Sequence, residues 1–247
     1  MPYDKDFIKN ATLNALKMME DSGFEISDNL EVVVDPELPF MGYSTKRRSG
    51  HVIVVSGMAL ESGLVEGLLI HEMSHIYRTE TNHPSYNHKL LESVMRTIVY
   101  KNRIIEDYQL NIIHQAINHI QDLYADDIAF KVFEKSKLLT LDQIRDFFLS
   151  WIKDTLIESK SIKEKWLNVG IMLNNCFAIS NMIRHSTKDI GKAEDLIRRF
   201  LSQTDDSMEK EFMLFRNFMI NLKENISEKE FEKDLVDYLT RMIRLVK

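Results

Sequence analysis

The segment His71–His75, with the sequence HEMSH, constrains this chain most, because its chemistry requires a helix. Residues four apart lie on one face of a helix, so the imidazoles of His71 and His75 can bind the same metal ion. Glu72 lies beside them and can act as general base toward a water molecule that the metal activates. The pattern therefore predicts a helix and indicates a zinc-dependent hydrolase.

The residues around this segment favour the helical interpretation. Leu64, Leu68 and the two histidines recur at spacings of three and four, which is the period of a helix. A β-branched segment at 51–55 precedes them and is typical of a strand. The alternative is a solvated helix that carries two histidines by chance, and the apolar context argues against it.

Composition bounds the class of protein. The 247 residues can form one large domain or two smaller ones, and a content of 44% hydrophobic and 28% charged residues excludes a disordered chain. A net charge of -6 argues against nucleic acid as the main partner. The single cysteine, Cys176, excludes an internal disulfide and has apolar neighbours. No signal peptide or apolar run of about 20 residues is evident, so we expect a cytoplasmic protein without a membrane span.

The pattern along the chain predicts an α+β protein that is mostly helical. The expected strands are 31–35 and 51–55, with a basic turn at 46–50 between them. Helices are expected over 4–22, from Ser56-Gly57 to about 80, over 86–135 as one or two helices, and over 141–160, 162–184, about 189 onward, 207–224 and 228–246. We therefore expect a front domain over 1–137 and a helical domain over 138–247.

A catalytic zinc ion needs a third protein ligand besides the two histidines. Asp122 and Asp126 lie four residues apart on an expected helix and so share a face. One carboxylate can bind the metal while the other accepts a hydrogen bond from a ligand histidine. His119, one turn before Asp122, is an alternative ligand, so the third ligand is Asp122, Asp126 or His119.

These motifs resemble those of the gluzincin metallopeptidases, in which an HExxH helix is followed by a helix with further acidic residues. Within that group the chain is similar to the small minigluzincins and to the catalytic core of the HtpX-type heat-shock proteases and CAAX prenyl endopeptidases. The similarity covers about residues 31–130. It includes the strand and turn at 51–58, the helix at 65–75, and 122–129, which resembles the family's Glu-x-x-Ala-Asp-x-x-Ala.

The resemblance implies a zincin-like front half with a small sheet, and hydrolysis of peptide bonds in a peptide or protein substrate. The helical spacing of apolar residues after it predicts a C-terminal helical bundle appended to this half. It implies that zinc (Zn²⁺) is held by His71, His75 and Asp122, that Glu72 is the general base, and that Asp126 supports a ligand histidine. Asp122 replaces the family's glutamate and is one methylene shorter, so its helix must lie closer to the metal, although zinc accepts aspartate. Ser74 replaces a common glycine. A membrane or lipidated substrate is not implied, since the family's membrane helices are absent.

Three further expectations concern the substrate and the activity. In the family, the strand before the HExxH helix lies at the sheet edge and binds extended peptide, which would assign this role to Val52, Ile53, Val54 and Val55; an ordinary core strand is the alternative. Candidate donors to the developing oxyanion are Tyr124, His119 and His185. The competing function is a catalytically inactive or latent zincin scaffold that binds or regulates another protein.

Overall fold

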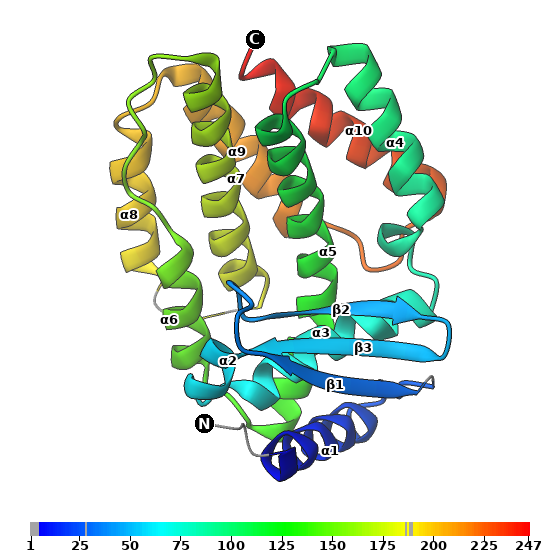
Figure 1. The fold of residues 1–247 in the computed structure, drawn as a ribbon. Coiled ribbons are helices and arrows are strands. Elements are labelled where there is room, and N and C mark those ends of the chain that lie inside the picture. Colours follow the sequence, from blue (N-terminus) through cyan, green and yellow to red (C-terminus); the bar gives the residue numbers. More distant parts are fainter. Residues whose placement is uncertain (1–4, 28, 186, 188–189) are drawn as a thin grey trace. The chain divides into compact units, whose positions relative to one another are not determined.

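The hydrophobic pattern produces helices over most of the chain and one small sheet (Figure 1). We describe these elements from a computed structural model, which covers residues 5–27, 29–185, 187 and 190–247. Its strands are β1 (Leu30–Asp35), β2 (Gly42–Arg47) and β3 (Gly50–Ser56). Its helices are α1 (Lys5–Asp21), α2 (Gly57–Glu61), α3 (Val65–Glu80), the 3₁₀ turn η1 (Pro84–Tyr86), α4 (His88–Asn102), α5 (Asp107–Ser136), α6 (Leu141–Trp151), α7 (Ile162–Arg184), α8 (Gly191–Leu201), α9 (Asp206–Ile220) and α10 (Glu228–Arg244).

The chain divides into two compact units, each made of two stretches of the sequence. The first unit comprises the chain up to His83 together with 124–140, and the second comprises 84–123 and 141–247. Residues 84–123 belong to the second unit because α4 packs on α10 and His119 of α5 stacks on Phe177 of α7. Helix α5 therefore contributes to both units.

The sheet of the first unit has the order β1-β3-β2, with β1 parallel and β2 antiparallel to β3. Strand β2 is a correction, because we expected only two strands. Its sequence, GYSTKR, is polar and mostly exposed, and it forms a hairpin with β3 that hydrophobic patterning does not reveal.

The strand expected to bind substrate at the sheet edge is not an edge strand. It contains Val52, Ile53, Val54 and Val55. These residues lie in β3, which is the central strand, with β1 on one side and β2 on the other. All four are at most 7% exposed. An added peptide strand needs unpaired backbone groups, and β3 already uses both of its edges, so it is the core strand and not the edge.

The sequence predicted one helix from Ser56-Gly57 to about residue 80, but the structure has two helices there, α2 and α3. Ser56 caps the short helix α2 by accepting a hydrogen bond from the backbone N–H of Ala59, and Gly63 then adopts a left-handed conformation with φ of 70°. Only glycine takes this conformation at little cost, so the chain turns there and α3 begins at Val65. The end of α3 at Glu80 agrees with the prediction.

The helices of the second unit are close to those predicted, with one exception. Helix α6 ends at Trp151 and not near 160, because two asparagines of α7 bind the backbone that follows. Asn175 accepts from the N–H of Lys153 and donates to its carbonyl, and Asn168 does the same with Ile157. This satisfies the backbone without a helix. The predicted capping box of Ser227 and Glu230 at the start of α10 is present.

Among the residues that the structure describes, no helix is both long and apolar enough to cross a lipid bilayer.

Candidate metal centre

Helix α3 brings its two histidines together, as the sequence predicted. The Nε2 atoms of His71 and His75 lie 3.0 Å apart, and the rings meet edge to face with centroids 4.7 Å apart. The helix is anchored by side chains that are at most 2% exposed, namely Leu69, Ile70, Met73 and Ile76. The apolar residues therefore hold α3 in the core and leave the histidine pair half-exposed.

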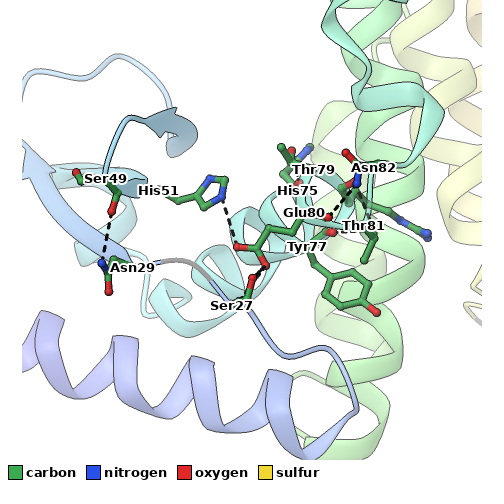
Figure 2. A network of polar contacts seen from close by, with 11 residues as sticks. Ser27, Asn29, Ser49, His51, His75, Tyr77, Thr79, Glu80, Thr81 and Asn82 are labelled. Atoms are coloured by element: carbon green, nitrogen blue, oxygen red, sulfur yellow. Dashed lines mark hydrogen bonds and ion pairs between the residues drawn. The ribbon is translucent and has the colours of Figure 1, made fainter.

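The end of α3 is also fixed to the start of the sheet (Figure 2). Glu80 lies 3.5 Å from Nε2 of His51, through Oε1, and its Oε2 accepts hydrogen bonds from the backbone N–H and hydroxyl of Ser27 at 2.9 and 3.0 Å. The side chains of His51 and Glu80 are 2% and 10% exposed. The contact of Glu80 with His51 is therefore screened from water, which strengthens it relative to an exposed contact of the same kind.

The carboxylate of Asp126 contacts His71 at Nδ1, the ring nitrogen that does not face His75. Its Oδ1 lies 2.8 Å from Nδ1 of His71, so the ring donates from Nδ1 and presents the lone pair of Nε2 toward His75. Asp126 is 5% exposed, which limits competition from water. This is the arrangement in which a carboxylate fixes the tautomer and orientation of a metal-binding histidine.

Asp122 completes a set of three donors. One ligand atom from each of His71, His75 and Asp122 lies within 4.8 Å of the others, and this is the one such group of histidine, cysteine or acidic residues found in the described part of the chain. Asp122 occupies the turn of α5 directly before Asp126, so the same continuous helix carries both carboxylates. Two imidazoles and one carboxylate, with a further position left open, are a donor set of catalytic zinc sites.

His119, the rival ligand, is placed differently from the pair on α3. Its side chain is 3% exposed and stacks on Phe177, with centroids 4.8 Å apart and an interplanar angle of 10°. Burial lowers its pKa to about 4, against the opposing effects of the Asp122 charge and a hydrogen bond with Asn174. The ring is therefore neutral at physiological pH and belongs to the core of the second unit.

Glu72 is buried without a polar partner. It is 5% exposed, and no hydrogen bond or ion pair connects its carboxylate to any other residue that the structure describes. Ser74, two residues on, is fully buried, and its hydroxyl donates to the carbonyl of Ile70.

The proposed oxyanion donors lie in separate surroundings. Tyr124 is fully buried, with its ring 4.3 Å from that of His83. His185 follows the last turn of α7 in the second unit, where its backbone N–H donates to the carbonyl of Asn181. His119 stacks in the same unit as described above.

One residue of this region was missed from the sequence. Arg78 is 6% exposed, and its Nε donates to the backbone carbonyl of Tyr124 on α5 at 3.0 Å. Its guanidinium lies 5.9 Å from the centroid of the Tyr124 ring. The signal was its spacing, because residues seven apart also share a helix face, and Arg78 follows His71 by seven.

The fold and site define an α+β, mostly helical protein with a cluster of two histidines and an aspartate that can hold a metal ion. The chain belongs to DUF5781, a family of unknown function, which it matches over residues 6–244. No curated protein and no solved structure matches the chain.

Proposed function

We propose that this protein is a zinc-dependent hydrolase of peptide bonds. The observation that carries the proposal is Glu72, a carboxylate that is almost completely buried, has no polar partner in the described chain, and directly follows a metal-ligand candidate. A purely structural metal site has no need of such a group and closes its fourth position. The geometry of His71, His75 and Asp122 and the support from Asp126 agree with this function.

Each residue would then have one role. His71, His75 and Asp122 would hold the zinc ion, which when bound makes a water molecule more acidic and offers positive charge to the carbonyl oxygen of the substrate. Glu72 accepts the proton of the attacking water on its carboxylate and delivers it to the departing amine. Asp126 keeps His71 in the tautomer whose Nε2 can bind.

The first experiment measures metal content and turnover together. We expect about one zinc per chain by elemental analysis and hydrolysis of an unstructured peptide mixture that stops when zinc is removed. Glu72→Gln should keep the metal and lose activity by a factor of about 100 to 10,000, because it cannot take up the proton. Glutamine has nearly the same shape as glutamate, so the helix stays intact.

Glu66→Gln provides the matched control, since Glu66 lies on the same helix and is partly exposed in its first turn. We expect it to retain both zinc and activity. Equal hydrolysis by Glu72→Gln and by the unchanged protein would contradict the mechanism. Iron in place of zinc would also contradict the proposal, because two histidines and one carboxylate are equally the ligand set of iron oxygenases. A protein that binds zinc and hydrolyses no peptide would favour the scaffold function.

A further inference from the structure

Arg78 links the helix of the histidines to the helix of the carboxylates. It follows His75 by three residues and His71 by seven, so it extends the same face of α3 by one turn. Its Nε donates to the carbonyl of Tyr124 on α5 at 3.0 Å. Tyr124 stands two residues after Asp122 and two before Asp126, at the centre of the turn that carries both carboxylates.

Two aromatic rings and a backbone hydrogen bond surround the contact between Arg78 and Tyr124. The guanidinium of Arg78 lies 5.9 Å from the centroid of the Tyr124 ring, and the ring of His83 packs against the same tyrosine at 4.3 Å. The backbone N–H of His83 donates to the carbonyl of Arg78, so the chain after α3 turns back onto this contact. We call Arg78, His83 and Tyr124 the clamp. All three are at most 8% exposed.

The position of the clamp matters because the candidate site requires one register of α5 against α3. One residue along a helix advances it by about 1.5 Å. It also rotates the side chains by about 100° around the helix axis, which would carry Asp126 away from Nδ1 of His71, now 2.8 Å from its carboxylate. A buried arginine is a costly way to fill space, and an apolar side chain would pack there at less expense. The burial of Arg78 therefore indicates that its polar contacts matter, and not only the volume that it fills.

We propose that Arg78 is a positioning residue that sets the register of α5 on α3, so that Asp126 meets His71 and Asp122 reaches the histidine pair. Its importance for catalysis rests on the proposed zinc function, whereas its effect on the contact of His71 with Asp126 does not. Arg78 touches none of the reacting atoms and acts through the backbone of α5.

The decisive experiment uses the full-length protein without metal. The ring N–H that His71 donates to Asp126 should give a protected proton resonance in a ¹⁵N-labelled sample, identified by its absence from His71→Gln. Arg78→Met keeps the length of the side chain and removes the donor, and we expect it to lose this resonance. Arg78→Gln is uncharged and too short to reach Tyr124, and it serves in the same way if the methionine variant does not fold. Arg78→Lys retains a donor and should recover the signal in part.

The second part adds Zn²⁺ alone and measures its dissociation constant by chelator competition. Arg78→Met should bind zinc about 10-fold more weakly than the unchanged protein, at the lower end of the losses seen when groups behind metal ligands are removed. Ile53→Ala is the control, because Ile53 is fully buried in β3 and its loss lowers stability without touching the clamp. We expect the control to keep both the resonance and the zinc affinity.

An unchanged His71 resonance in a folded Arg78→Met or Arg78→Gln variant would overturn the inference. So would loss of the resonance in Ile53→Ala, because general destabilisation would then explain both results. Absence of zinc binding in the unchanged protein would contradict the proposed function alone, and the resonance would still decide the role of Arg78.

Discussion

At the scale of single residues, two aspartates on neighbouring turns of α5 have different contacts. Asp126 bonds to Nδ1 of His71, on the side of the ring away from His75, whereas Asp122 joins the two histidines in the donor cluster. Removal of a supporting carboxylate costs about 10- to 100-fold in metal affinity, and removal of a ligand costs more. The two positions can therefore be distinguished by measurement.

We predict that Asp122→Ala weakens zinc binding more than Asp126→Asn does. The first change removes a donor atom, while the second leaves all three donors and weakens only the orientation of His71, by about 10- to 100-fold. Dissociation constants from chelator competition test this order. Full retention of zinc by Asp122→Ala would move the third ligand to another residue, and His119→Ala would then be the variant to measure.

His119 gives a prediction about pH. Burial, the largest cause, holds its pKa near 4 in the folded protein, below the ordinary value of 6.5. The unfolded chain therefore binds a proton between pH 6.5 and 4 that the folded protein does not, and stability falls as pH falls through this range. The loss amounts to roughly 3 kcal/mol by pH 4.

His119→Phe should flatten that dependence, because phenylalanine preserves the stack on Phe177 and does not titrate. Denaturant unfolding at several pH values between 4 and 7 measures the slope for both proteins. The absolute stability of the variant can shift in either direction, so the slope is the quantity compared. An identical slope in the two proteins would show that His119 is not the group responsible.

At the scale of elements, the β2–β3 hairpin depends on Gly50. Its φ is +140°, and a Cβ built there would lie 2.1 Å from the backbone carbonyl oxygen of Asn29, the residue before β1. The N–H of His51 donates to that same carbonyl, so the start of β3 and the entry to β1 are in direct contact. Only a residue without a side chain permits this approach.

We predict that Gly50→Ala lowers the free energy of unfolding by about 1–3 kcal/mol from backbone strain, and by more once the contact with Asn29 is displaced. Gly23→Ala is the matched control, because Gly23 also has a positive φ, of 86°, but a Cβ added there would meet nothing within 4 Å. Chemical denaturation of the two variants compares them. Equal losses would show that strain alone, and not the close approach to β1, is what Gly50 avoids.

The predictability of an element depended on where its partners lie in the sequence. Helices α3 and α7 and strand β3 were predicted correctly because the apolar residues within each element have the spacing of a helix or a strand. Strand β2 was not, because it is polar and is defined by pairing with β3. The early end of α6 was missed because Asn168 and Asn175, far along the chain, bind the segment that follows.

At the scale of the whole molecule, the two units are interleaved in the sequence. The chain leaves the first unit at His83, returns at Tyr124, and leaves again after Thr140. Within the second unit, α4 packs on α10, and Ile112 of α5 lies beside Gly170 of α7. A cut between two domains placed near residue 137 therefore separates helices that pack together.

We predict that a fragment of residues 1–140 does not fold as a stable unit. It retains α4 and the first half of α5 but lacks the helices that bury Val94, Ile98 and Ile113, each at most 1% exposed in the whole chain. Exposed apolar side chains of this kind favour aggregation. Thermal unfolding followed by circular dichroism, together with size-exclusion chromatography, tests the fragment. A monomeric fragment with a sharp transition would contradict the prediction.

In the candidate site too, residues grouped by spacing within one helix were predicted, and contacts between helices were not. His71, His75, Asp122 and Asp126 were selected from the sequence, because a spacing of four on a helix places side chains on one face whatever the rest of the chain does. Arg78 shares the helix face of His71 by its spacing of seven, but its partner is a backbone carbonyl of another helix, and that contact has no signature in the sequence. The burial of Glu72 could not be foreseen either, because it depends on how other segments pack around α3.

What the sequence by itself determined were the periodic elements and the residues grouped within one helix, since both follow from local geometry and apolar spacing. Only the tertiary structure decided that β3 is the central strand, that residues 84–123 belong with the C-terminal helices, and that the carboxylates of α5 meet the histidines of α3. These are pairings between segments far apart in the chain. Their free energy comes from burial and hydrogen bonds that exist only once the segments are packed.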